Sequence, residues 1–488
     1  MRFLTAAVLT LASGALAADV STAAQLRDAI SNATPGTVIR LAPGHYAVGA
    51  AMWTGANGTA GQPITITSAD VATAVLDVDA QEGLVINHAY WVVERVWING
   101  VCAGGCNDSA GLHLKNTSDH FIGRNLRVTN FGEDIKGDRT PDKEVADSAI
   151  LDCEISNTAP EMSGGGTGID LVGGKRWRIA GNYVHDYARD GVHYAIFLKG
   201  GTSEGVIEKN LVIGAKTLPH GSGAEVGISF GGGGTGPQFC DTTNKGASFC
   251  TCEDFNGVAR NNVVINVNDS AMHSKVACGS QFLNNTVVGS SPGLQVQIAS
   301  TGGAVEAHNN VFSGGISGTA TASNNLLNVA DFGPLYANVA SYDFSEGTAA
   351  GAIKDKGPAL AKVTDDYFGS PRSGPNDWGA FEFPSRGMVW PWGSMTHSGP
   401  GSDGGVTASD AGAPGATDSG VMRPSVDAGA LSDAGVRTSG DGGSGAVDAP
   451  VLCGCSGVPG SAISAVVFGL WSLTRSSRSR KRSKNRHL

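Results

Sequence analysis

The sequence predicts an all-β protein folded as a right-handed parallel β-helix, a solenoid closed at its N-terminal end by a short capping helix. Three observations support this: 71 glycines with only 16% charged residues, a recurring asparagine motif, and short alternating segments before it. So much glycine disfavours a helical protein, and a hydrophobic content of 41% disfavours a disordered one. We therefore expect many short strands joined by turns.

An asparagine followed by three mostly apolar residues recurs through the chain. The intervals are 28 or 29 residues between positions 125 and 210, and 23 and 25 between 262 and 310. The interval of 52 between these two groups is one repeat that carries an insertion. A period of this size with short strands is typical of a solenoid, in which each asparagine side chain would hydrogen-bond from coil to coil. The motif begins at Asn125, Asn182, Asn210, Asn262, Asn285, Asn310 and Asn325, and Cys153 takes the same place.

Segments before these asparagines place apolar residues at alternate positions, as in Ile169/Leu171 and Ile196/Leu198. Such alternation is typical of a strand with one buried face. Each repeat thus carries at least two strands separated by turns.

The two ends of the domain can also be assigned. Thr22-Ala-Ala-Gln25 is a capping box that starts one short amphipathic helix, which would cover the open apolar end of the first coil. The stretch "GSPRSGPNDWGAFEF" would close the domain near Phe383. The β-helix domain is expected over residues 18–385.

Both ends of the chain carry targeting features. Residues 1–17 combine a positive end, an apolar stretch and a small-residue cleavage site, which indicates a secretory signal peptide. Residues 386–450 are rich in Gly, Ala, Ser and Asp and should form a disordered linker. Residues 451–488 contain Cys-Gly-Cys, a short apolar segment at about 458–474 and a basic end.

That order of parts resembles the C-terminal sorting tag of myxobacterial surface proteins. The resemblance implies that Cys453 or Cys455 is where the tail is processed and the protein is anchored. An ordinary tail anchor is the alternative, with the apolar segment as a short transmembrane helix held by the basic end. Both interpretations predict an exported protein that is either anchored at the cell surface or secreted after tail processing.

An exported protein can oxidise its cysteines. Cys102 with Cys106 is expected to close a small loop, and Cys153 is left over as a buried thiol. Two further disulfides can form among Cys240, Cys250, Cys252 and Cys278.

The opening of the domain, the segment "GQPITITS" at Gly61 and the ending together resemble exported β-helix proteins that include chondroitinase B and alginate lyases. The resemblance covers about residues 20–385. It implies a polysaccharide as partner and β-elimination on a uronate polymer. In that family a lysine removes the C5 proton, an arginine on the next coil assists, and Ca²⁺ or another cation neutralises the carboxylate.

Alignment of the strands by their buried residues puts Lys199, Gly231 and Lys275 at one outward position on successive coils. Neighbouring coils are about 4.8 Å apart, so the two lysines should lie about 10 Å from each other. Gly231 would leave a bare rung that a ligand could approach. An insertion over residues 235–256 leaves the same coil and could wall this site.

Lys275 matches the family lysine in context and is the first catalytic candidate. His273, on the same outward face, is the second. The place of the family arginine falls on Gln297, so the neighbour that would favour a neutral lysine base is missing. The acidic ligands expected before the lysine are replaced by Asn268 and Asp269. Ca²⁺ is therefore possible but its ligands are unassigned. The substrate-binding candidates are Lys199, Gly231, Asp170, His193 and Gln297.

The alternative is a non-catalytic polysaccharide-binding or adhesive surface protein, which the missing arginine and the net charge of −10 favour. The acidic balance also disfavours nucleic acid as a partner. We expect a monomer.

Overall fold

The computed structural model describes residues 17–385, apart from positions 72, 116, 140–142, 163, 233–234 and 298–302. The expected signal peptide (except Ala17), linker and sorting tail, with Cys453 and Cys455, lie outside these residues. No described helix has the length and apolar character that crossing a membrane requires.

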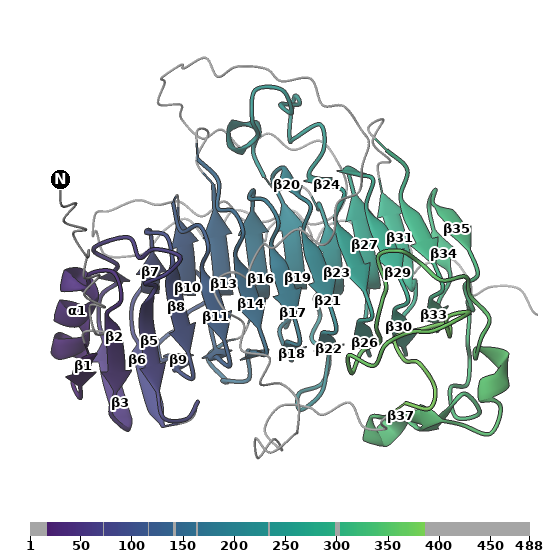
Figure 1. Cartoon of the computed structure of the whole chain (residues 1–488), viewed down its shortest axis with the longest axis horizontal. Coiled ribbons are helices and arrows are strands. Elements are labelled where there is room, and N and C mark those ends of the chain that lie inside the picture. Colours follow the sequence, from purple (N-terminus) through teal and green to yellow (C-terminus); the bar gives the residue numbers. More distant parts are fainter. Residues whose placement is uncertain are drawn as a thin grey trace, which may run out of the picture. The chain divides into compact units, whose positions relative to one another are not determined.

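Three long parallel sheets, here called A, B and C, are built from successive coils, and nearly every coil adds one strand to each sheet (Figure 1). Strands far apart in sequence thus become neighbours: β19 (Val192–Lys199) pairs with β16 (Thr167–Val172) on one side and β23 (Ala224–Phe230) on the other. The protein is a right-handed parallel β-helix, as the sequence predicts.

The remaining strands have the following bounds. Sheet A contains β1 (Ala17–Val20), β2 (Val38–Leu41), β5 (Ile64–Ser68), β8 (Trp91–Glu94), β11 (Ile122–Arg124), β14 (Ala149–Leu151), β17 (Arg178–Ala180), β21 (Val206–Glu208), β25 (Val258–Arg260), β29 (Gln281–Leu283), β32 (Glu306–His308) and β35 (Thr321–Ser323). Sheet B contains β3 (Gly44–Val48), β6 (Ala74–Val78), β9 (Trp97–Gly100), β12 (Arg127–Thr129), β15 (Glu154–Ser156), β18 (Tyr183–His185), β22 (Leu211–Ile213), β26 (Val263–Ile265), β30 (Thr286–Val288) and β33 (Val311–Phe312). Sheet C adds β4 (Met52–Trp53), β7 (Glu82–Ile86), β10 (Ala110–Lys115), β13 (Glu133–Asp138), β27 (Ser270–Lys275), β31 (Leu294–Gln297) and β34 (Ile316–Ser317). A small sheet contains β20 (Thr202–Ser203), β24 (Asp254–Phe255) and β28 (Ala277–Cys278).

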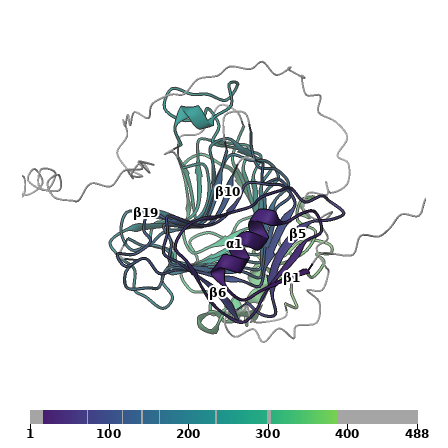
Figure 2. The ribbon, with the colours of Figure 1, turned by 90° about the vertical axis from the view of Figure 1, so that its left-hand side faces the viewer.

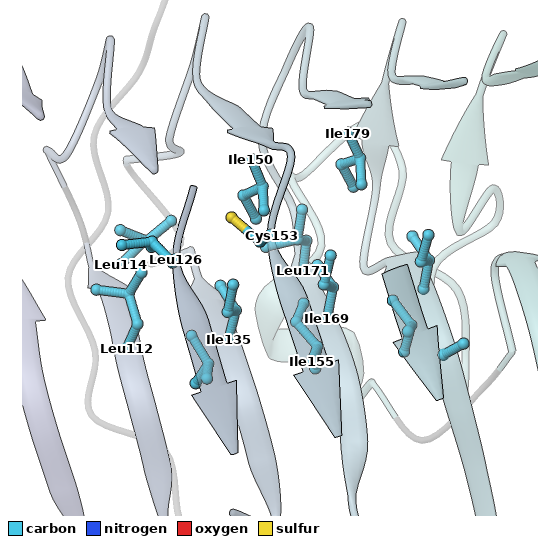
Figure 3. Close-up of a cluster of buried hydrophobic side chains, with 14 of the residues drawn as sticks. Leu112, Leu114, Leu126, Ile135, Ile150, Cys153, Ile155, Ile169, Leu171 and Ile179 are labelled. Carbon is cyan, nitrogen blue, oxygen red and sulfur yellow. The ribbon is translucent and has the colours of Figure 1, made fainter. Parts of the chain in front are cut away.

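The core consists of columns of apolar side chains that repeat from coil to coil. Leu112, Ile135 and Ile169 are register partners in sheet C, and all three are fully buried. Figure 3 shows them beside Leu171 and Cys153 in the interior between the sheets. Each such side chain contributes about 1.5–3 kcal/mol on burial, so the alternation seen in the sequence is the main source of stability.

Helix α1 (Ala23–Asn32) covers the first coil, where Figure 2 shows it lying across the end of the β-helix. Thr22 Oγ1 accepts a hydrogen bond from the Gln25 N–H at 3.2 Å, as expected for the N-cap. The Gln25 side chain accepts from the Ser21 N–H, one residue earlier than a capping box would place it. Leu26 and Ile30 are buried by this packing, so the helix closes the apolar end of the core.

A ladder of asparagines, buried except for the half-buried Asn325 at its end, links the turns between sheets A and B. The Oδ1 of each accepts the backbone and side-chain N–H groups of the asparagine one coil earlier, at 2.9–3.1 Å. The Nδ2 of each also donates to a carbonyl of sheet A. Cys153 donates its N–H to Asn182 and so occupies the first position. The other members are Asn182, Asn210, Asn262, Asn285, Asn310 and Asn325.

The assignment of Asn125 to this ladder is wrong. Arg127 pairs with Glu154, so Leu126 is the residue that aligns with Cys153. Asn125 has a φ of 51° and occupies the left-handed position just before the ladder. Asparagine is favoured at both positions, since it tolerates the left-handed region and also forms side-chain ladders. The sequence motif alone could not separate them.

The C-terminal segment, residues 329–385, packs on the outer faces of sheets A and B. It contains the antiparallel pair β36 (Tyr336–Asn338) and β37 (Asp343–Glu346) and the short helices η2 (Val339–Ser341) and η3 (Ala350–Ala352). Three left-handed turn residues, Asn261, Asn284 and Asn309, donate side-chain hydrogen bonds to its carbonyls at 2.8–3.0 Å. Phe383 lies in its aromatic cluster, close to the predicted end of the domain.

The expected disulfides are present. They join Cys102 to Cys106, Cys240 to Cys250 and Cys252 to Cys278. Cys153 is a buried free thiol, and burial raises its pKa to about 12. It therefore packs as a small apolar side chain in the core.

Replacing Asn262 with Ala should strongly destabilise the β-helix. The change removes four buried hydrogen bonds and leaves the Asn210 N–H and the Ile207 carbonyl without their side-chain partner. An unsatisfied buried group costs about 1–3 kcal/mol, so we expect a loss of at least about 3 kcal/mol, measured by thermal and denaturant unfolding. The control, Asn125→Gly, keeps a residue that accepts a positive φ and should change stability by less than about 1 kcal/mol. Equal losses in the two variants would contradict a special role for the ladder.

Candidate functional site on sheet C

The residues singled out from the sequence lie mainly on the outer face of sheet C. Lys199, Gly231 and Lys275 occupy one row on successive coils, and Gln297 is the register partner of Lys275 on the next coil. This row is the one the alignment of strands predicts. Asp138, the partner of Lys115 further along the row, was missed. We call this set the lysine row: Lys115, Asp138, Val172, Lys199, Gly231, Lys275 and Gln297.

A second outward row, two residues earlier in each strand, runs beside it. Asp170, Phe197, Ser229 and His273 follow one another from β16 to β27. His273 therefore lies on the same face as Lys275, as expected. His193 does not join them, because it lies six residues before Lys199 in the same strand, about 20 Å away along an extended chain.

His273 is a buried, neutral imidazole, with only 4% of the residue exposed. Ser229 Oγ donates to the Gly231 carbonyl at 2.5 Å, so the 2.9 Å contact between Ser229 Oγ and His273 Nδ1 requires the imidazole to donate. Burial and then the charge of Lys275 lower the pKa of His273 to about 4, and a hydrogen bond with Gln297 opposes this only in part. His273 thus adds no charge beside Lys275 at neutral pH.

Lys199 is held by its neighbours. Its Nζ lies 3.3 Å from an Asp170 carboxylate oxygen and 4.4 Å from the centroid of the Phe197 ring. Only 9% of Lys199 and 7% of Asp170 are exposed, so both are largely shielded from solvent. Lys199 and Asp170, predicted as separate substrate-binding residues, are thus paired with each other.

Gly231 is needed for close packing, which corrects the expectation of a bare rung. A Cβ at this residue would lie 2.0 Å from the Lys275 carbonyl oxygen and 2.8 Å from Glu253 Cβ. At Gly232, a Cβ would lie 2.4 Å from the Phe197 ring. The space above the rung is thus taken up by Glu253 at the end of the insertion, a segment whose path could not be read from the repeat.

One disulfide closes the loop of the insertion, and another fastens its C-terminal end to the β-helix. It includes the short helix η1 (Pro237–Phe239), and the Cys240–Cys250 disulfide closes its loop. The Cys252–Cys278 disulfide ties it to β28, and β24 joins it to β20 (Figure 1). This disulfide bracing is as expected, and it places Glu253 beside the lysine row.

Charged side chains also follow the rows toward the N-terminal end of sheet C. The ring nitrogens of His113 lie 2.9 Å from Glu82 and 2.9 Å from Asp138, and Lys115 Nζ lies 2.7 Å from Glu82. Lys115 also lies 5.3 Å from the ring centroid of Trp53. The signal for this network was present in the segment "GLHLK", whose polar residues alternate with the buried ones.

Asn268 and Asp269 stand where the resembling lyases place acidic ligands for a cation. Asn268 is engaged by Glu225: its Oδ1 accepts from the Glu225 N–H at 2.8 Å, and its own N–H donates to the Glu225 carboxylate. In the described part of the chain, no group of three His, Cys, Asp or Glu side chains is arranged to bind a metal ion. The Asn268 side chain is thus already hydrogen-bonded, and a role for Ca²⁺ stays a prediction from the sequence.

A surface cavity lies away from these residues. It has a volume of about 370 Å³ and sits on the outer face of sheet A, between Val206, Val258 and Lys362. Because the candidate residues lie on sheet C, this cavity is not part of their site.

The folded protein should lose stability in acid through His273. Its pKa is lowered in the folded state from about 6.5 to about 4, so the unfolded chain binds the proton first as pH falls. The contribution is complete above pH 6.5 and declines by about 3 kcal/mol toward pH 4. A His273→Asn variant keeps a donor to Ser229 but cannot titrate. Its melting temperature should therefore fall less than that of the wild type between pH 6.5 and 4. Parallel pH curves for the two proteins would contradict the assignment.

No known protein family and no curated protein matches the sequence. Among solved structures, the chain is similar to the pectate lyase Pel9A, with a TM-score of 0.51 and 14% identity over 73% of this chain and 90% of that one. A rhamnogalacturonan lyase gives 0.44 and 14% over 63% and 80%, and an alginate lyase from Paenibacillus sp. str. FPU-7 gives 0.34 and 17% over 58% and 98%. At these identities the likeness to Pel9A shows that the two chains share a fold.

Proposed function

We propose that this is an exported, carbohydrate-active protein of the lyase type, which cleaves a uronate polymer by β-elimination with Lys275 as the base. The observation that carries the proposal is the position of Lys275. It ends β27 on the outer face of sheet C, and no side chain of the described residues forms a hydrogen bond or ion pair with its ammonium group. Lys199, by contrast, is paired with Asp170.

The neighbours of Lys275 suit an anionic sugar. A neutral His273 lies on one side and the Gln297 amide on the other, and the Gln297 amide can donate a hydrogen bond to a hydroxyl or carboxylate oxygen. A neutral Lys275 amine would take the C5 proton of a uronate. The C4–O bond would then break, a C4=C5 double bond would form, and the leaving oxygen would take a proton. The shared fold with a pectate lyase supports this direction, although fold alone does not assign chemistry.

The second candidate is non-catalytic binding of an acidic polysaccharide. Gln297 stands where the resembling lyases place an arginine, and its amide carries no charge that would favour a neutral Lys275. A charged Lys275 could still hold a carboxylate. Absorbance of an unsaturated product on a panel of uronate polymers separates the two functions directly.

Lys275→Ala should abolish turnover with little effect on the melting temperature. The side chain points outward, so its truncation opens no core cavity, whereas loss of a positioned base costs about 10²- to 10⁴-fold in rate. Lys354→Ala, a surface lysine of the C-terminal segment, is the matched control and should keep full activity. Gln297→Arg should raise a weak activity. Full lyase activity of Lys275→Ala would end this assignment, and binding without any product would favour the second candidate.

For localisation, we propose that the tail over residues 451–488 anchors the protein at the cell surface after processing at Cys453 or Cys455. The support is the order of Cys-Gly-Cys, apolar segment and basic end in the sequence. Replacing both cysteines with alanine should leave the tail attached and change the mass of the surface form, as read by mass spectrometry of the membrane fraction. Unchanged tail mass and unchanged display would contradict it.

A further inference from the structure

Glu253, in the insertion, contacts the residues that directly follow both lysines of the site. It is fully buried. Its carboxylate accepts the Gly200 N–H at 2.8 Å and the Cys250 N–H at 3.3 Å, and its own N–H donates to the Val276 carbonyl at 2.8 Å. Gly200 directly follows Lys199, and Val276 directly follows Lys275. One residue thus fixes the ends of β19 and β27.

Glu253 packs against Gly231, the rung between the two lysines, and its carboxylate accepts the N–H of Gly200, the residue after Lys199. The residue packs against the glycine so closely that a Cβ at Gly231 would meet Glu253 Cβ at 2.8 Å. Gly231 is the rung between Lys199 and Lys275. Burial raises the pKa of Glu253, while the Gly200 N–H and the charges of both lysines favour its ionised form. The carboxylate and the lysine charges therefore act on one another.

The other charged groups around Glu253 have partners of their own. Lys199 pairs with Asp170 at 3.3 Å. Arg139, whose guanidinium would lie 3.5 Å from a Cβ on Gly201, pairs with Glu144 at 3.7 Å. His273 is neutral at ordinary pH. Among the described residues, Lys275 is thus the cation of the site that forms no ion pair of its own. The charge of Glu253 therefore acts on Lys275 without competition from another carboxylate.

We propose that Glu253 is a specificity-determining residue of this site, a buried counter-ion carried by the disulfide-braced insertion that weakens the attraction of Lys275 for anionic ligands. An anion that binds Lys275 must then compete with the Glu253 carboxylate. A polymer with carboxylates on successive sugars makes several contacts at once and competes better than a single small anion. This inference rests on the proposed function for the class of ligand. Its first test measures only the reactivity of Lys275 and so does not depend on the proposed function.

The first test measures the rate at which a sulfonated, negatively charged acylating reagent modifies Lys275, by quantitative peptide mass spectrometry. Glu253→Gln keeps an acceptor for the Gly200 N–H and removes the charge, so the rate should rise on the order of 3- to 10-fold at low salt, with a smaller gain at high salt. A purely structural role would leave the rate unchanged or lower it, and either result would overturn the proposal.

Asp254→Asn is the matched control, because Asp254 is the neighbouring buried carboxyl but hydrogen-bonds Thr202, Gly257 and Ser280, away from the lysine row. It should leave the Lys275 rate as in the wild type, and an equal increase would overturn the proposal. Should Glu253→Gln fail to fold, the double variant Cys252→Ser, Cys278→Ser releases the part of the insertion that carries Glu253. Faster modification of Lys275 is expected there too, and an unchanged rate would count against the proposal.

A second measurement separates this inference from the proposed function. Binding of polygalacturonate and alginate oligosaccharides should be several-fold tighter for Glu253→Gln than for the wild type. If Lys275 reacts faster in the variant but no uronate is bound or cleaved, the role of Glu253 stands and the proposed function fails. If the wild type cleaves a uronate polymer and Glu253→Gln changes neither rate nor affinity, the proposed function stands and Glu253 is only structural.

Discussion

The in-register hydrogen bonding between stacked coils is the constraint on which the rest of the structure depends. It places every residue about 4.8 Å from its partner on the next coil, and a slip of one residue would exchange the buried and exposed faces. The core columns and the asparagine ladder impose the same register independently, since Asn262 bonds to both Asn210 and Asn285 while Met272 and Ile228 pack in the core. Side chains outside the core inherit this order and form straight rows.

These rows explain why charges gather on sheet C and how they are tolerated. A charge on a crowded sheet face loses solvation, so it needs a partner on a neighbouring coil. His113 lies between Glu82 and Asp138, and Lys199 lies beside Asp170. Lys275 departs from this pattern, because no side chain of the described residues forms an ion pair with it, and the charge of Glu253 acts on it from a neighbouring segment. In such a stack of coils, a candidate functional residue is most easily recognised as the charged residue that has no ion-pair partner on a neighbouring coil.

The sequence allowed the fold and the order of the lysine row to be predicted, because both follow from a period of alternating burial. It could not assign Asn125 to its true position, since two adjacent turn positions both favour asparagine. The pairing of Lys199 with Asp170 depends on side-chain conformations across coils, which periodicity does not specify. Gly231 was predicted to leave an open rung because the insertion that fills the space beside it carries no repeat. The path of the insertion could therefore not be derived from the sequence.

The insertion is the part of the site that does not follow the register of the stacked coils. It can therefore bring in a side chain that the repeat does not position. The residues of the two outward rows are positioned by backbone pairing between neighbouring coils, so the site could change its ligand only by exchange of side chains within the rows. The insertion instead brings Glu253 into the site from outside the rows and holds it there with a disulfide and the Gly200 N–H. Each coil must keep its register because the core depends on it. A loop inserted into the coil can nevertheless change the charge of the surface of sheet C.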